Sequence, residues 1–342
     1  MKKLYIFLAL SLSLAASAQC PNGNVELTTQ AQVNAFASTY PNCTQINGIL
    51  SIHGDNITDL TPLQNLTTVT GALQVYLNPS LTSLNGLQNI TSTGGLEVSY
   101  NSTLTSVAGL SGVTTVNGYL GFTANPQLLT LEGLNIQAVG SLISISQFAG
   151  TNLHGLESIS SGGFFLEVKF SPNLTSLDGL DGMTSLADYL YIYSNPVLSN
   201  IEGIANIDFN NFQPITIQNN PMLSQCSVAS VCNHLTGGSA GTFGGNLPGC
   251  NGSQEIIAGC NLSTAGFQEA GISIYPNPTD GLLTVILPER QNLTGIRIAD
   301  LSGKILISSA SDNIDISSLA TGIYILHATS GQAIFTSKII RK

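Results

Sequence analysis

The chain has 342 residues, of which only 8% are charged, and its 19 acids outnumber its nine lysines and arginines. The imbalance is concentrated between Gln19 and Gly271, where fourteen acids face a single cation, Lys169, for a net charge of −13. Such a surface cannot neutralise phosphate groups, so we expect no nucleic-acid partner, and binding to an anionic membrane surface is disfavoured for the same reason. No apolar stretch beyond residue 18 is long enough for a transmembrane helix.

Residues 1–18 are predicted to be a secretory signal peptide. Two lysines begin it, an apolar core covers 4–14, and small residues occupy a cleavage site at 16–18. A lipoprotein signal would acylate Cys20, but Gln19 stands where such a signal places a small residue. We therefore expect cleavage before Gln19 and an ordinary disulfide cysteine at position 20.

Six cysteines follow the signal peptide, and an even number of cysteines in an exported chain indicates disulfides. They gather at the two ends of a long central region, as Cys20 and Cys43 at the front and Cys226, Cys232, Cys250 and Cys260 at the rear. We predict a bridge between Cys20 and Cys43. The four rear cysteines allow three pairings, of which Cys226–Cys250 together with Cys232–Cys260 is favoured.

A repeat of 23 to 25 residues runs through residues 46–225. Each unit begins with alternating apolar and polar residues, as in a strand with one face inward. Asn78 and its equivalents end the strand, and Gly86 and its equivalents mark a bend that favours glycine. Equivalent strand starts fall at Leu50, Leu73, Leu96, Leu120, Ile143, Leu166, Leu190 and Ile215. This period predicts a solenoid whose stacked coils need caps at both ends.

The caps are expected at residues 19–45 and 226–260. At the front, Thr28 or Thr29 is suited to begin a short helix that turns Val33 and Phe36 to one face. At the rear, we expect a short helix over 227–235 and one last degenerate coil over 242–246.

The unit over 73–87, with its pattern Leu-x-Val-x-x-Asn-Pro-x-Leu-Thr-Ser-Leu-x-Gly-Leu, resembles the receptor L-domain type of leucine-rich solenoid. The first unit, over 50–63, is more similar to internalin-type bacterial repeats. The resemblance covers residues 44–250. It implies a right-handed solenoid with parallel sheets and a recognition role, and it carries over no residue that contacts a ligand.

The composition changes after Cys260. A linker rich in small residues is expected over 261–271, and short strands separated by turn residues over 272–342 predict a small antiparallel β-sandwich. The predicted fold class is therefore mainly β: a right-handed, leucine-rich or β-helix-like solenoid with disulfide caps, followed by this sandwich.

The last segment carries a specific set of motif residues: Tyr275, Pro276, Asn277, Pro278, Gly303, Lys304, Gly322 and Tyr324. With these motifs, residues 272–342 closely resemble the type A sorting domain of the type IX secretion system of Bacteroidota. The resemblance implies that the secretion machinery is a partner of 272–342. It also implies passage through the periplasm to a secreted or outer cell-surface location, with the rest of the chain released or attached to surface lipopolysaccharide.

No pattern of catalytic, cofactor-binding or metal-ligating residues stands out. The histidines at 53, 154, 234 and 327 are far apart and lie in no metalloprotease, lipase-type or phosphate-loop motif. Asp178 and Asp181 lack the ligand density of a calcium loop. We therefore predict a protein without enzymatic activity, cofactor or metal.

The best candidate surface is the outward side of the strand ladder, because stacking aligns equivalent residues of successive coils. Tyrosines with a few charges suit recognition, since tyrosine offers a flat apolar face and a hydroxyl. The same residues are also good strand formers. The candidate ligand face consists of Gln74, Tyr76, Glu97, Tyr100, Glu167, Lys169, Phe170, Tyr191 and Tyr193.

Three functions follow from this sequence. The first is an exported recognition protein that binds an unidentified protein or carbohydrate ligand through the strand face. The second is a structural or adhesive surface component in which the solenoid acts as a spacer. The third is a β-helix enzyme acting on polysaccharides, which would require Glu97, Lys169 and a histidine to converge in space.

Overall fold

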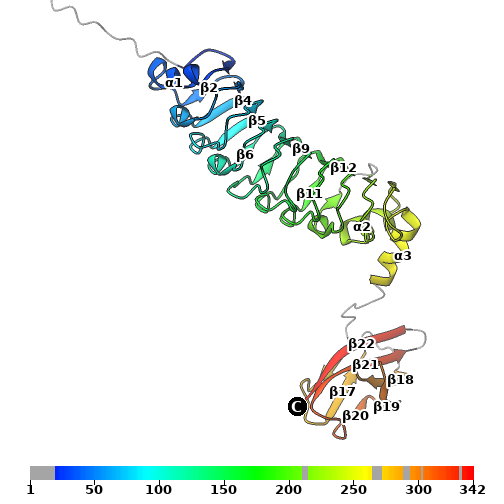
Figure 1. Ribbon diagram of the computed structural model, residues 1–342. Helices are drawn as coiled ribbons and strands as arrows, with labels where there is room; N and C mark the ends of the chain where they lie inside the picture. Colours follow the sequence, from blue (N-terminus) through cyan, green and yellow to red (C-terminus); the bar gives the residue numbers. More distant parts are fainter. Residues whose placement is uncertain (1–19, 210–214, 264–271, 288–292, 302, 331–332) are drawn as a thin grey trace, which may run out of the picture. The chain divides into compact units, whose positions relative to one another are not determined.

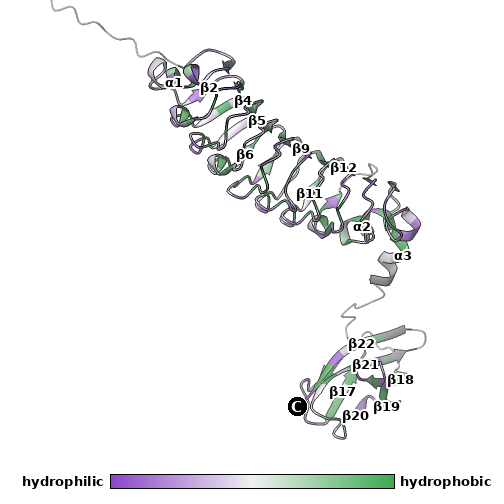
Figure 2. Ribbon diagram, in the orientation of Figure 1, coloured by the Kyte–Doolittle hydropathy of each residue, from purple (hydrophilic) through white to green (hydrophobic). Residues whose placement is uncertain are grey.

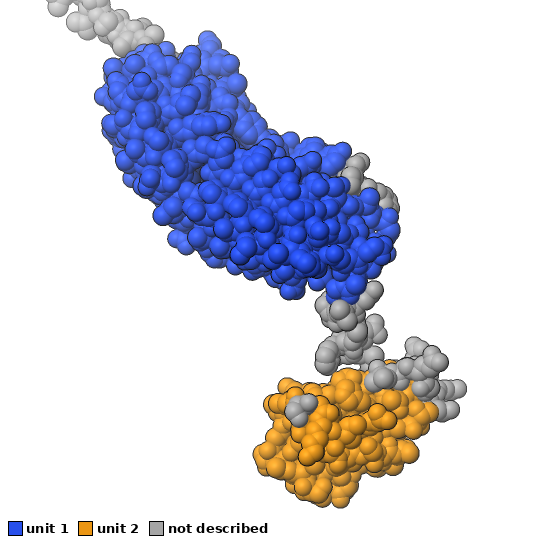
Figure 3. All heavy atoms as spheres, turned by 45° about the vertical axis from the view of Figure 1, so that its right-hand side comes forward, with its two compact units in different colours: residues 1–260 blue, residues 261–342 orange. Residues whose placement is uncertain are grey.

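The computed structural model describes residues 20–209, 215–263, 272–287, 293–301, 303–330 and 333–342. The chain divides into two compact units, one ending at Cys260 and the other beginning at Asn261 (Figure 3). The predicted signal peptide lies outside the described residues, as does most of the predicted linker. Of that segment, residues 261–263 are described, and they form the end of a helix.

Unit 1 is a stack of coils, each of which adds a strand to a 13-stranded sheet (Figure 1). Neighbours along its main path are parallel, which confirms a mainly β fold with a large parallel sheet. The strands of this path are β1 (Val25–Leu27), β3 (Leu50–Ile52), β4 (Thr68–Tyr76), β5 (Ser92–Ser99), β7 (Leu120–Thr123), β9 (Leu142–Ser146), β10 (Phe165–Lys169), β12 (Tyr189–Tyr193), β14 (Ile215–Gln218) and β15 (Gly241–Gly244).

Shorter elements complete the coils. They are the strands β2 (Gln45–Ile46), β6 (Thr115–Val116), β8 (Ala138–Val139), β11 (Ser185–Leu186) and β13 (Asp208–Phe209), and the 3-10 turns η1 (Thr61–Leu63), η2 (Ala108–Leu110) and η3 (Glu202–Ile204).

The strand register confirms that the predicted positions are equivalent, although five of the strands, β4, β5, β9, β10 and β12, begin before them. Leu50 lies opposite Leu73, Leu73 opposite Leu96, and the alignment continues to Leu166 opposite Leu190. These residues point inward and are fully buried, as are most later leucines of the repeat, so that one apolar core runs through all coils. Both hydrophobic and hydrophilic stretches occur along the whole stack (Figure 2), and within the strands buried and less buried residues alternate, as in β10 and β12.

A column of buried asparagines ties successive coils together. The Asn101 Nδ2 donates to the carbonyl oxygen of Val75 at 2.9 Å, and the Asn101 Oδ1 accepts from the backbone N–H of Asn78 at 3.1 Å. Asn195 and Asn220 repeat this pattern farther along. Phe148 and Ser171 replace the asparagine in two coils, where the Ser171 hydroxyl takes over the bond to the Phe148 N–H at 3.2 Å.

The residue before each of these positions adopts a left-handed conformation, with φ between +52° and +56° in seven consecutive coils. None of the seven is glycine, although this region is uncommon for other residues. Their side chains turn away from the core, and Leu77, Tyr100 and Phe170 are about half exposed. The sequence pattern did not predict this column.

The repeated glycines pack closely against the preceding coil, and some of them also adopt a positive φ. Four of them have φ between +97° and +114°, as the predicted bend requires: Gly86, Gly133, Gly155 and Gly179. Gly109 and Gly203 do not have positive φ. A Cβ at either position would lie 2.1 Å from a backbone oxygen of the preceding coil, so there the close approach of two coils requires glycine.

The front cap is the helix α1 (Gln30–Thr39) together with β1. Thr29 is the N-cap, and Thr29 and Gln32 form a reciprocal capping box. Val33 and Phe36 are buried, as predicted, and Cys20 is bonded to Cys43. Strand β1 was not expected, because its three residues are too short to display the repeat pattern.

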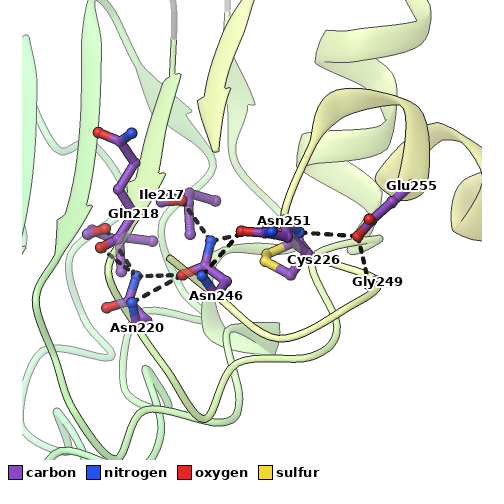
Figure 4. Close-up of a disulfide and its surroundings, with 10 residues drawn as sticks. Ile217, Gln218, Asn220, Cys226, Asn246, Gly249, Asn251 and Glu255 are labelled. Atoms are coloured by element: carbon purple, nitrogen blue, oxygen red, sulfur yellow. Dashed lines mark hydrogen bonds between the residues drawn. A yellow bond between two sulfur atoms is a disulfide. The ribbon is translucent and has the colours of Figure 1, made fainter. Parts of the chain in front are cut away.

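The rear cap contains α2 (Ala229–Thr236), β15 and α3 (Ser253–Ser263), with disulfides between Cys226 and Cys250 and between Cys232 and Cys260. Both are the favoured pairs. Figure 4 shows how the asparagine column ends here. The Asn246 Oδ1 accepts from the N–H of Asn220 at 2.9 Å, and its Nδ2 donates to the carbonyl oxygen of Cys250 at 2.9 Å. The column is thus joined to a disulfide.

Unit 2 contains two antiparallel sheets over one apolar core. One sheet consists of β16 (Ser273–Tyr275), β17 (Leu282–Ile286) and β20 (Asn313–Asp315), and the other of β18 (Gly295–Ala299), β19 (Ile305–Ser309), β21 (Gly322–Ser330) and β22 (Ala333–Arg341). The predicted antiparallel sheets are therefore present, with β20 as an additional short strand.

Candidate recognition face

The outward side chains of the strand ladder form columns along the stack, in the register predicted from the sequence. One column contains Gln74, Glu97, Glu167 and Tyr191, separated by Gly121 and Ser144 on β7 and β9. The next column contains Tyr76, Ser99, Lys169 and Tyr193, separated by Thr123 and Ser146. Larger side chains therefore gather at the two ends of the face, with small ones over β7 and β9 between them.

The end of the face nearer α1 is a polar network around Glu97. The Gln74 Nε2 donates to a Glu97 carboxylate oxygen and to the Tyr119 hydroxyl, both at 3.2 Å, and the Ser99 hydroxyl donates to the other carboxylate oxygen at 3.0 Å. Burial, with the negative charge of Glu97 as a smaller contribution, raises the pKa of Tyr119. Tyr119 lies one position before its strand starts and was not among the predicted residues.

The end nearer α2 carries an ion pair and several aromatic rings. Lys169 Nζ is bonded to the Glu167 carboxylate, whose other oxygen accepts from the Ser144 hydroxyl at 2.9 Å. Tyr191 is 44% exposed. The rings of Phe165 and Tyr189 lie parallel with centroids 5.1 Å apart.

These rings line a hollow of about 300 Å³ together with Leu142, Leu166, Glu167 and Tyr191. Phe165 and Tyr189, like Tyr119, precede the strand starts used for the prediction. Outward-facing positions continue to the residue just before each predicted strand start, and including that position would have identified these three residues.

A second hollow, of about 740 Å³, lies along the left-handed column. It is lined by Ala124, Pro126, Gln147, Ala149, Phe170, Pro172 and Asn173. It lies where the column continues from the bulky Leu77 and Tyr100 to Ala124 and Gln147 in the following coils. The Phe170 ring, held edge-on against Tyr193 at 5.7 Å, forms one wall.

The residues that an enzymatic site would need lie in separate pairs. Glu97 is bonded within its own network, and Lys169 to Glu167. The His53 Nε2 lies 2.8 Å from a Glu26 oxygen, and the ring of His53 stacks on that of Tyr76. No group of three or more histidine, cysteine or acidic side chains that could hold a metal ion occurs in the part of the chain that the structure describes.

The first part of the sorting motif, residues 275–278, is bonded to β22 of unit 2. The Asn277 amide joins the motif to β22, since its Nδ2 donates to the carbonyl oxygen of Lys338 and its Oδ1 accepts from the N–H of Ile340, both at 2.8 Å. Pro276 and Pro278 follow cis peptide bonds. The Tyr324 hydroxyl donates to the carbonyl oxygen of Ala320 at 2.8 Å.

The turn motif of unit 2 is separate from these residues in the sequence. Gly303 has a φ of +85°, and the N–H of Lys304 donates to a carboxylate oxygen of Asp300 at 3.1 Å. Gly322 begins β21, opposite Arg341 of β22.

Comparison with protein families identifies both parts of the chain. Residues 22–112 match the model of the Receptor L domain, and residues 273–342 match that of the Secretion system C-terminal sorting domain. The front of the solenoid is therefore similar to the Receptor L domain, and unit 2 carries a type IX sorting domain, which indicates secretion to the outer cell surface or beyond. Neither family is enzymatic. A comparison with curated proteins found no significant match.

The L-domain match covers the front cap and the first coils, whereas the strand register continues without interruption to β15. Among the described residues, no helix has both the length and the apolar composition needed to cross a membrane.

Proposed function

We propose that unit 1 is a non-catalytic recognition module, displayed on or released from the outer cell surface, which binds a protein or glycan ligand through its strand face. The secretion machinery recognises residues 272–342 and delivers the module. The observation that carries this proposal is the alignment of exposed aromatic rings with a fixed ion pair on one side of a rigid ladder. The right-handed sense of the solenoid, which the L-domain resemblance implies, belongs to the proposal.

The rigidity of the ladder supports a binding role. Each outward side chain stands on a strand that is bonded to neighbours on both sides, so little backbone conformational entropy remains to be lost on binding. Tyr191 and Phe170 stay exposed although an apolar core runs directly beneath them. Exposed aromatic groups of this kind are typical of interaction sites.

The domain scheme of the proposal follows the predicted boundaries: signal peptide 1–18, front cap 19–45, solenoid 46–225, rear cap 226–260, linker 261–271 and sorting domain 272–342. A nucleic-acid ligand is no part of it, because Lys169 is the only cation between residues 19 and 271 and is already paired with Glu167.

Glycan and protein arrays probed with the purified protein test the proposal. We expect saturable binding to at least one member of either class. A solenoid that serves only as a spacer would bind none of them, and that outcome would refute the recognition function.

A further inference from the structure

A cluster of partly exposed aromatic rings lies over β10 and β12. Tyr191 is 44% exposed and Phe165 36%, and the Phe165–Tyr189 pair forms one side of the 300 Å³ hollow. Glu167 and Tyr191 also line it, each two residues farther along its strand than Phe165 and Tyr189. A concave apolar hollow with one fixed polar group is the usual form of a small-molecule site.

The polar group in this hollow is positioned before any ligand arrives. Glu167 is held by Lys169 on one oxygen and by Ser144 at 2.9 Å on the other, and its side chain remains 25% exposed. A carboxylate has about four acceptor positions, so Glu167 can still accept hydrogen bonds from hydroxyl groups. The centre of a protein–protein interface, in contrast, is depleted of acidic residues. A hydroxylated ligand therefore suits the hollow better than a protein surface.

The charge of the module selects among hydroxylated ligands. Its net charge of −13 repels anions, and its one cation, Lys169, is already neutralised by Glu167. Sugars that carry phosphate, sulfate or carboxylate groups would meet no free cation here. A neutral ligand is consistent with these charges.

We infer that the hollow over β10 and β12 binds a neutral glycan. This assignment rests on the proposed function, since it names the ligand class of the same face. The apolar faces of the sugar rings lie against Tyr191 and Phe165, and sugar hydroxyls donate to Glu167. Next along the stack, β9 contributes Leu142 to the lining of the hollow and carries the small residue Ser144 in the register of Glu167, so a glycan chain can continue along the ladder there.

Isothermal titration of the purified protein with cellohexaose, laminarihexaose and mannohexaose tests this site, with hexagalacturonate as the anionic probe. We expect at least one neutral hexasaccharide to bind and hexagalacturonate to bind at least tenfold more weakly. Tyr191→Ala should weaken the neutral interaction at least tenfold. Leu77→Ala is the control, because it removes an apolar side chain of similar exposure that follows β4, away from the hollow. It should leave the binding of the neutral glycan unchanged. Far-UV circular dichroism verifies that both variants fold.

The outcomes separate the glycan assignment from the broader function. If all three neutral probes fail, if hexagalacturonate binds as tightly, or if Tyr191→Ala has no effect, the glycan assignment is wrong. If the arrays then detect a protein ligand whose binding depends on Tyr191, the recognition function stands without the glycan. If they detect no ligand of either class, both proposals fall.

Discussion

The asparagine column predicts a large stability cost for Asn101→Ala. Asn101 is fully buried, and its amide makes four hydrogen bonds, two to Asn78, one to Val75 and one to Asn125. The substitution leaves the buried N–H of Asn78 without its acceptor, which costs about 1–3 kcal/mol, and removes further bonds of smaller net value. We expect the free energy of unfolding to fall by about 2–4 kcal/mol in total.

Urea unfolding followed by far-UV circular dichroism measures this loss. Asn89→Ala is the matched control, because Asn89 lies in the same part of the stack and makes one exposed bond, to the carbonyl oxygen of Gln64 at 2.7 Å. That bond is worth about 1 kcal/mol or less. Equal losses in the two variants would show that the column does not hold the coils together and would refute the reasoning.

Three further predictions concern the sorting unit, the rear cap and the strand face. Asn277→Ala removes both bonds to β22 and should lower the melting temperature of unit 2 and the amount of protein in the culture medium; normal secretion would contradict this role. Replacing Cys226 and Cys250 together by serine opens a 24-residue loop and should cost about 3–4 kcal/mol of stability in unit 1, which calorimetry measures; an unchanged melting temperature would refute it. The pKa of Tyr119 is raised, so in a pH titration its phenolate absorbance should appear at a higher pH than that of the exposed tyrosines. This late transition should be absent in Tyr119→Phe. The neutral phenol is favoured in the folded state, so this contribution to stability is complete below the ordinary tyrosine pKa and is lost as the pH rises through the raised one.

The parts of the fold that depend on periodicity could be predicted from the sequence. A coil must bury Leu73 and Val75 against their equivalents, and this requirement alone sets the register of every strand and of the outward columns. The clustering of the cysteines at the two ends of the repeat predicted the Cys20–Cys43 bridge and left three pairings open for the four rear cysteines, of which the structure has the favoured one.

Features that depend on contacts between coils could not be predicted from the periodicity of the sequence. The recurrence of Gly109 is visible in the repeat, but its cause, the close approach of a backbone oxygen, is not, and neither is the left-handed conformation of Tyr100. Helix α3 occurs once, outside the repeat, so comparing repeat units could not predict it. The aromatic hollow was missed for a simpler reason: Phe165 and Tyr189 stand one residue before the strand starts on which the columns were based.

The recognition function is tested most directly by a comparison of two double variants on the same arrays. Tyr191→Ala with Tyr193→Ala removes aromatic surface from the strand face. Leu129→Ala with Met222→Ala removes exposed apolar surface, 63% and 55% exposed, from turns that follow β7 and β14. We predict that the strand-face variant loses the array ligand while the turn variant retains it. Retained binding in the first variant, or equal loss in both, would contradict recognition through the strand face.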